Sequence, residues 1–268
     1  MTYCVAMLLD TGLVFLSDSR TNAGVDQIST FRKATVFQKP GDRVLVLQSS
    51  GNLAITQTVV SMLKEDIDAA AGIGVGGAGQ AAKTAAASRP NLMNVPNLFE
   101  AARCVGDALR ELHRRDAGPL KDFGVDFSAG LTLGGQIKGE TPRLFSIYAA
   151  GNFIEATTDT SYFQIGESKY GKPIIDRVLR RTSSLNEAVK CALVSMDSTI
   201  RSNLSVGLPL DLVIVKRDRF NVARHISIDA DNEYFRGIRG RWSEALREAF
   251  VELPDPDWLS AVARDLAD

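Results

Sequence analysis

The chain begins with an apolar run that starts directly after its second residue. Residues 3–9 read Tyr-Cys-Val-Ala-Met-Leu-Leu, the turn Asp-Thr-Gly follows at 10–12, and residues 13–17 are again mostly apolar. Two such runs joined by a short turn that contains glycine predict a β-hairpin. Because neither run alternates between apolar and polar residues, we expect both faces of its sheet to be covered. Thr2 is therefore expected at the end of a strand held rigidly inside the fold.

Further strands and helices follow in a regular order, with the helices inserted in pairs. In chain order, the pattern predicts strands at 31–38 and 43–48, helices at 52–67 and 97–115, strands at 125–136, 142–150 and 161–165, helices at 172–181 and 185–201, and strands at 211–216 and 222–228. Sheets that are covered on both faces, with paired helices between the strand groups, predict an α+β fold of four layers, helix–sheet–sheet–helix.

Two segments fall outside this pattern. Residues 68–92 are rich in alanine and glycine, and such small side chains bury little surface, so we expect a flexible insertion that is dispensable for folding. Residues 232–268 predict a C-terminal helical extension to a domain that spans 2–231. The extension carries aromatic residues that a protein surface rarely leaves exposed. We therefore expect this segment to contact a neighbouring subunit, and the alternative is that it packs on its own subunit.

Composition argues against several classes of function. The formal net charge is −1 and the arginines are scattered, which does not suit a nucleic-acid surface. Asp10 and Gly12 interrupt the first apolar run, so neither a signal peptide nor a membrane span is expected. Three widely spaced cysteines indicate a reduced, cytoplasmic setting, and two histidines without paired cysteines argue against a metal site. Gly74, Gly76 and Gly79 match a dinucleotide fingerprint, but helix rather than strand precedes them, so no cofactor is predicted.

Three polar residues lie in or next to strands whose other residues are mostly apolar. Thr2 begins the first run, Asp18 ends the second, and Lys33 lies in the next predicted strand. Since the hairpin turns at 10–12, Asp18 returns beside Thr2. Removal of Met1, which the small second residue favours, would leave a hydroxyl nucleophile and an α-amine base on one threonine. That amine has an ordinary pKa of about 7.7–8.0, and a nearby lysine oriented by an aspartate lowers the pKa of the hydroxyl.

Four stretches form a recognisable pattern: residues 2–7, 17–26, 31–33 and 47–52. The longest reads Ser-Asp-Ser-Arg-Thr-Asn-Ala-Gly-Val-Asp. The pattern resembles the proteasome β-subunit family of N-terminal nucleophile hydrolases, and within it the Anbu branch, the bacterial ancestral β-subunit related to the protease half of the HslUV machine. The resemblance implies the four-layer αββα sandwich of these hydrolases, threonine-type endopeptidase activity and a self-compartmentalised homo-oligomer, a ring or a spiral of many subunits.

The resemblance also implies roles for individual catalytic residues. Thr2 is the implied nucleophile, with Asp18 and Lys33 as its support. Ser50 is the implied oxyanion donor, through its backbone N–H, and Ser168 the implied assistant of the amine.

Other positions complete the implied site. Arg20, Thr21 and Gly51 are expected to contact the substrate. Glu167 competes with Ser168 for the place beside the amine, and we interpret it as a solvated loop acid. The family's late aspartate–serine pair is altered, because serine stands at position 202.

Several alternatives remain open at this level. The chain could cleave peptides or unfolded proteins, with or without an ATP-dependent unfoldase, or a small amide, or it could be a weakly active or inactive assembly scaffold. Lys33 could also be a solvated strand lysine. A thiol mechanism through Cys4 with His113 or His225 is disfavoured, since Cys4 lies within an apolar strand and His225 reads as structural.

Overall fold

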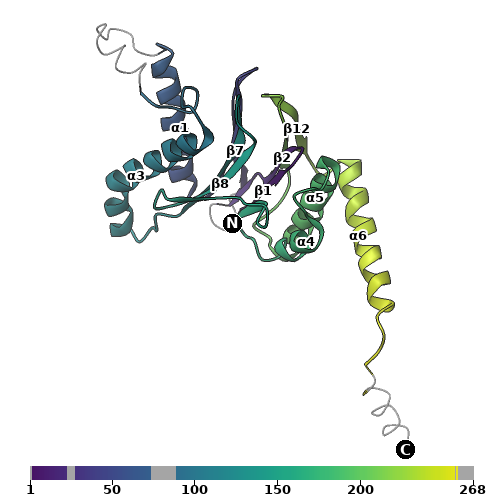
Figure 1. Cartoon of the computed structure of the whole chain (residues 1–268). Helices are drawn as coiled ribbons and strands as arrows, with labels where there is room; N and C mark the ends of the chain where they lie inside the picture. The colour runs from purple at the N-terminus through teal and green to yellow at the C-terminus, as the bar shows by residue number, and fades with distance from the viewer. Residues whose placement is uncertain (1, 23–27, 74–88, 257, 259–268) are drawn as a thin grey trace, which may run out of the picture. The chain divides into compact units, whose positions relative to one another are not determined.

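The computed structural model describes residues 2–22, 28–73, 89–256 and 258. The chain divides into two compact units, residues 1–230 and residues 231–268, each of which is described by itself. The first unit contains two five-stranded sheets, a two-stranded sheet and the helices that cover the larger sheets (Figure 1).

The first large sheet has the antiparallel order β10–β1–β2–β11–β12. Its strands are β1 (Tyr3–Leu9), β2 (Gly12–Asp18), β10 (Tyr162–Gly166), β11 (Leu210–Lys216) and β12 (Val222–Ile228). β1 and β2 form the predicted hairpin, in which Cys4 lies opposite Ser17 and Leu9 opposite Gly12. Every residue of both strands is buried, which confirms that both faces of this sheet are covered.

The second large sheet has the antiparallel order β5–β6–β7–β8–β9. Its strands are β5 (Ala34–Lys39), β6 (Arg43–Gly51), β7 (Ala129–Ile137), β8 (Arg143–Tyr148) and β9 (Phe153–Glu155). The small sheet pairs β3 (Arg20–Asn22) with β4 (Ile28–Thr30). β5 begins at Ala34 rather than at residue 31, so Lys33 lies just before the strand in which it was expected.

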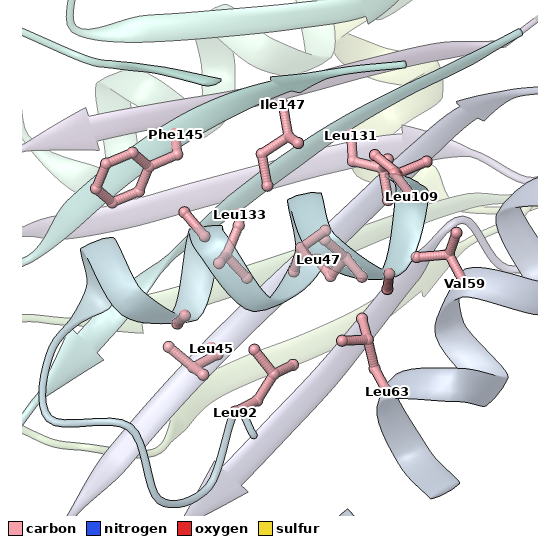
Figure 2. Close-up of a cluster of buried hydrophobic side chains, with 14 of the residues drawn as sticks. Leu45, Leu47, Val59, Leu63, Leu92, Leu109, Leu131, Leu133, Phe145 and Ile147 are labelled. Atoms are coloured by element: carbon pink, nitrogen blue, oxygen red, sulfur yellow. The ribbon is translucent and has the colours of Figure 1, made fainter. Parts of the chain in front are cut away.

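Two helices cover the outer face of the second sheet. They are α1 (Leu53–Ala70) and α3 (Leu98–Asp122), and each is capped by an asparagine side chain, Asn52 or Asn97. Val59 and Leu63 of α1 and Leu109 of α3 meet leucines of β6 and β7 in one apolar cluster (Figure 2). The apolar stripe of each helix therefore packs on the sheet, as its spacing predicts.

The other two helices of the first unit cover the first sheet. They are α4 (Lys172–Val178) and α5 (Leu185–Ser202), and Ser184 and Glu187 form the predicted capping box at the start of α5. The Tyr3 hydroxyl lies 3.0 Å from the Ser195 hydroxyl, which ties β1 to α5. Figure 1 shows α1 and α3 on one side of the two sheets and α4 and α5 on the other, so the predicted α+β fold of four layers is confirmed.

The core between the two sheets is apolar and continuous. Leu8, Leu13 and Phe15 of the first sheet pack against Val44 and Val46 of the second. The residues that alternate with these along each strand point to the other face of the sheet and pack against the helices, because successive side chains of a strand point to opposite faces. This alternation explains why nearly uninterrupted apolar runs are needed in β1 and β2.

The ends of the predicted insertion at 68–92 belong to packed structure. α1 continues to Ala70, and Leu92 is fully buried in the cluster of Figure 2. The Arg43 guanidinium donates hydrogen bonds to the carbonyl oxygens of Leu92 and Val95 at 3.2 and 2.9 Å, which fixes the return of the chain. The middle of the stretch, with Gly74, Gly76 and Gly79, lies outside the described residues.

The second unit contains one described helix, α6 (Glu233–Val251), whose N-cap Asn232 accepts a hydrogen bond from the Phe235 N–H at 2.9 Å. Leu246, Phe250 and Val251 are exposed on this helix. Contact of this segment with a neighbouring subunit stays a prediction. None of the helices that the structure describes is both long enough and apolar enough to cross a membrane.

Candidate active site

A cavity of about 990 Å³ in the first unit collects most of the predicted site residues. Those that line it are Thr2, Arg20, Thr21, Lys33, Ser50 and Gly51. They come from the start of β1, from β3, from the segment before β5 and from the end of β6. The cavity therefore lies where the open end of the β1–β2 hairpin meets the end of β6.

Asp18 and Lys33 form a buried ion pair beside this cavity. The Lys33 ammonium lies 2.7 Å from Asp18 Oδ1, and it also donates to the carbonyl oxygen of Arg20 at 2.7 Å. Asp18 is fully buried and the Lys33 side chain is only 6% exposed, which excludes the alternative of a solvated strand lysine. Burying both charges costs desolvation energy, so such a pair needs good geometry and further hydrogen bonds.

The environment of Asp18 acts on its ionisation in two directions. Burial raises the pKa of the Asp18 carboxyl above its ordinary value, while the Lys33 ammonium and hydrogen bonds from Lys33 and the Tyr3 N–H oppose this rise. The Tyr3 N–H donates to Asp18 Oδ1 at 2.9 Å, the same oxygen that binds Lys33. One carboxylate oxygen thus connects Lys33 to the backbone directly after Thr2.

Thr2 is held from its other side by the chain that follows β10. The Glu167 N–H donates to the Thr2 carbonyl oxygen at 2.7 Å. Gly166 adopts a φ of +83°, and a Cβ atom there would lie 2.0 Å from the Thr2 carbonyl oxygen, so only glycine allows this approach. β1 therefore enters the site clamped between Asp18 and Glu167.

Glu167 is not the solvated loop acid that the sequence suggested. Its side chain is 7% exposed, and its carboxylate accepts a hydrogen bond from Asn203 Nδ2 at 3.1 Å. The interpretation was wrong because the partner, Asn203, lies far along the chain, and no local pattern reports that contact. The strand-ending glycine directly before Glu167 was the available signal.

The structure does not bring Ser168 to the Thr2 cavity. Ser168 lines a separate cavity of about 310 Å³ together with Tyr162, Lys172 and Asp176. β10 ends at Gly166, and the chain then places Glu167 inward while Ser168 lies at this other surface. The order of residues in the sequence motif could not show which of Glu167 and Ser168 lies near Thr2.

Ser50 and Gly51 end β6 at the wall of the cavity. Gly51 adopts a φ of +106°, and a Cβ atom there would lie 2.4 Å from the Ser128 carbonyl oxygen. The Ser50 hydroxyl donates to the Gly130 carbonyl oxygen at 3.3 Å, so the side chain is engaged with β7. Ser50 pairs with Gly130 of β7, and the preceding Ser49 N–H donates to the Lys33 carbonyl oxygen on the opposite side. Because successive N–H groups of a strand point to opposite neighbours, the Ser50 N–H points toward β7, which disfavours its predicted role as the oxyanion donor.

His225 also lines the cavity, which the sequence analysis missed. Its Nε2 atom lies 2.6 Å from Asp211 Oδ1, and the Asp211 side chain is only 5% exposed. Asp211 stands in the otherwise apolar β11, opposite Ser17 of β2. An acid within an apolar strand was the signal that could have pointed to this pair.

The alternative thiol mechanism has no support in the geometry. Cys4 is fully buried, and burial raises the pKa of its thiol. The ring of His113 packs against Phe127, with ring centroids 4.9 Å apart, on the helix side of the second sheet. Within the described parts of the chain, no group of three or more histidine, cysteine or acidic residues could hold a metal ion.

Solved structures share this fold and much of this sequence. Anbu (ancestral β-subunit) from Yersinia bercovieri is 53% identical, with a TM-score of 0.83, and the match covers 95% of this chain and 98% of that one. The chain belongs to the Anbu family. Anbu from Hyphomicrobium sp. strain MC1 is 50% identical over 95% of this chain and 99% of that chain, with a TM-score of 0.83.

A further Anbu structure concerns an assembly. It is the helical assembly of the Anbu complex from Pseudomonas aeruginosa, 47% identical over 95% of this chain and 98% of that chain, with a TM-score of 0.84. No family model and no curated protein matches the chain. The resemblance to Anbu, whose most specific stretches lie within residues 2–52, is confirmed by these structures, and their matches cover 95% of this chain.

Proposed function

We propose that this chain is a threonine-type hydrolase of peptide bonds, with Thr2 as its nucleophile. The observation that carries the proposal is the buried Lys33–Asp18 pair, 2.7 Å apart, next to the cavity that Thr2 lines. Because a buried charge pair does not generally improve stability over apolar residues, the presence of this pair beside Thr2 favours a chemical role.

In the proposed reaction, removal of Met1 first leaves the α-amine of Thr2 free. The amine takes the hydroxyl proton while Oγ forms a bond to the substrate carbonyl carbon. The carbon–nitrogen bond then breaks, the leaving amine takes the proton, and the acyl group remains on Oγ as an ester. Water, deprotonated by the same amine, hydrolyses the ester and restores the threonine.

The neighbouring residues act on this threonine through charge and position. The Lys33 ammonium favours the ionised hydroxyl, and Asp18 orients the lysine and balances its charge. A backbone N–H donor at this end of β6 would stabilise the oxyanion by about 2.7–4 kcal/mol. We assign a positioning role to Glu167, because its N–H holds the Thr2 carbonyl oxygen. No role is retained for Ser168, which the resemblance implied as the assistant of the amine.

The size of the cavity favours peptides over small amides. Its volume of about 990 Å³ lies at the upper limit of ordinary small-molecule sites, which span about 300–1,000 Å³. A small amide would leave much of this wall without contact. We therefore retain a peptide as the substrate.

We also propose a cytoplasmic homo-oligomer. Support comes from the helical assembly of the related Anbu complex and from the exposed apolar residues Leu246, Phe250 and Val251 of α6. The cysteines are all free, as a reducing compartment requires. An assembly would confine a threonine site that has little selectivity of its own.

Intact-mass measurement tests the mechanism. The mature chain is expected to lack Met1 and to gain one adduct mass when it is treated with a peptide epoxyketone, which bonds to both the hydroxyl and the amine of an N-terminal threonine. Thr2→Ala should gain none, while Thr11→Ala, a substitution in the exposed hairpin turn, should label normally. A retained Met1 without any adduct would refute the proposal and leave the assembly scaffold as the function.

A further inference from the structure

The lining of the Thr2 cavity carries charge of one sign. Among the residues that the structure describes, its charged and titratable members other than Thr2 are all basic: Arg20, Arg32, Lys33, Lys64 and His225. No aspartate or glutamate of the described residues lines it. A cleft lined by one sign of charge concentrates ligands of the opposite sign. The cavity wall is therefore suited to an anionic ligand.

The basic side chains of the cavity differ in whether an acidic residue of the protein already neutralises their charge. The Lys33 ammonium is neutralised by Asp18 at 2.7 Å. Arg32 and Lys64 are exposed, and neither forms an ion pair with any part of the chain that the structure describes. These two cations are available to a ligand without breaking an internal contact.

His225 adds a polar group whose orientation is fixed. Asp211 Oδ1 lies 2.6 Å from Nε2 of the ring, so a carboxylate that is itself buried holds the imidazole at the wall. An aspartate in this position favours a proton on Nε2. The cavity wall therefore presents the imidazole of His225, and not the carboxylate of Asp211, to a ligand.

One face of α1 forms a long side of the cavity. Its members recur at helical spacing: Leu53, Thr56, Gln57, Val60, Ser61 and Lys64. They are distinct from Ile55, Val59 and Leu63, which pack into the core. Because a helix rises 1.5 Å per residue, this face is about 16 Å long, which equals about five residues of extended chain.

Lys64 lies at the far end of this face from the reacting residues. The helix starts at Leu53, directly after the end of β6, and the Ser49 N–H of β6 donates to the Lys33 carbonyl oxygen at 3.0 Å. Lys33 and the start of α1 thus belong to the Thr2 end of the cavity. A group that meets Lys64 belongs to a substrate residue several positions from the bond that is cleaved.

We infer that the cavity takes extended peptides with carboxylate side chains, and that Lys64 pairs with a carboxylate several residues from the scissile bond. This inference rests on the proposed hydrolase function. A single-stranded nucleic acid is also an extended anion, but its binding relies on aromatic stacking platforms. No phenylalanine, tyrosine or tryptophan of the described residues lines the cavity, which favours the acidic peptide.

Matched electrophilic peptides test the inference on the assembled full-length protein. We would compare acetyl-Glu-Glu-Ala-Leu-epoxyketone with its Gln-Gln and Lys-Lys counterparts and measure the rate of adduct formation on Thr2 by intact mass. The Glu-Glu probe should react about tenfold faster than the Gln-Gln probe, and Lys-Lys should be slowest. High ionic strength should reduce the Glu-Glu advantage, because salt screens exposed charges.

Two variants assign the effect to Lys64. Lys64→Gln should remove most of the Glu-Glu advantage, so that the Glu-Glu and Gln-Gln probes label this variant at similar rates. Lys190→Gln, an exposed lysine on α5 away from the cavity lining, should keep the full advantage. Equal rates for all three probes on wild type, or an advantage that Lys64→Gln retains, would overturn the inference.

A binding measurement separates this inference from the proposed function. Fluorescein-labelled Glu-Glu-Ala-Leu and Gln-Gln-Ala-Leu peptides report affinity by fluorescence anisotropy without any reaction at Thr2. If no epoxyketone labels Thr2 but the Glu-Glu peptide binds about tenfold more tightly, and Lys64→Gln removes this difference, the hydrolase proposal fails and the binding preference stands. Equal binding of both peptides would overturn the preference by itself, and tighter binding of fluorescein-labelled oligo-dT than of the Glu-Glu peptide would replace it with a nucleic-acid site.

Discussion

The two ends of the β1–β2 hairpin are equally buried, yet they bury opposite kinds of groups. At the turn end, Leu8 and Leu13 pack into the apolar core between the sheets. At the open end, Asp18 is buried with Lys33 at the edge of a cavity. The turn end is explained by the hydrophobic effect, whereas the open end places charges where desolvation is costly. The contrast shows that the open end buries a charge pair next to the Thr2 cavity, whereas the turn end buries apolar side chains.

Substitution of Thr2, the proposed nucleophile, gives the largest expected effect and separates the two ends most sharply. Thr2→Ala should lower peptide hydrolysis by about 10³-fold or more, because the reacting hydroxyl is removed. The thermal midpoint should stay close to that of the wild type, since alanine fits the end of β1. Hydrolysis assays and calorimetry on the same preparation check both statements. Full activity in this variant would eliminate the mechanism.

Substitution of Lys33 tests whether the Lys33–Asp18 ion pair stabilises the open end of the β1–β2 hairpin. Lys33→Met should lower the free energy of unfolding by about 3–5 kcal/mol, because the carboxylate of Asp18 is left buried without its counter-charge. The double variant Lys33→Met/Asp18→Asn should regain much of that stability and remain inactive. Denaturant titrations and adduct formation measure the two outcomes. A Lys33→Met protein with wild-type stability and activity would remove the distinction between the hairpin ends.

A truncation at the turn end should have the opposite profile. Leu13→Ala removes a fully buried side chain from the core between the sheets and should cost about 2–5 kcal/mol of unfolding free energy. At a temperature where the variant is folded, the rate of Thr2 labelling per folded chain should match the wild type. A large loss of labelling in the folded variant would mean that the two ends are not independent.

Glu167 tests a positioning role at the open end. Glu167→Ala should reduce hydrolysis roughly ten- to a hundredfold, because the loss of the Asn203 contact loosens the chain that holds the Thr2 carbonyl. Glu167→Gln retains an acceptor for Asn203 and should keep most activity. The comparison of kcat/KM for the two variants distinguishes position from charge, and equal losses in both would assign the effect to charge.

The smallest effect is expected at Ser168. Because Ser168 lines a separate cavity, Ser168→Ala should change hydrolysis by less than about twofold, which steady-state kinetics can measure. A loss as large as that of Glu167→Ala would place Ser168 in the catalytic network and restore the assignment made from the motif.

Local patterns account for what the sequence could predict. Uninterrupted apolar runs and a short turn determine the β1–β2 hairpin, and that hairpin alone brings Asp18 beside the start of β1. Helical spacing and asparagine or serine caps locate α1, α3 and α5 to within a few residues at most boundaries. These features depend on neighbours in the chain, so periodicity and turn chemistry reveal them.

Contacts between distant segments required the tertiary structure. Glu167 is buried because Asn203 meets it, Leu92 is core because it returns to β6, and His225 reaches the cavity because Asp211 of the adjacent strand holds it. The contacts of Glu167 and Leu92 join loops whose paths depend on how the layers pack, whereas Asp211 and His225 meet across the β11–β12 pair, whose register is set only in the folded sheet. The sequence by itself determined the hairpin, the layer order and the Thr2, Asp18 and Lys33 constellation, whereas packing of the layers decided which acid, which histidine and which cations share the cavity.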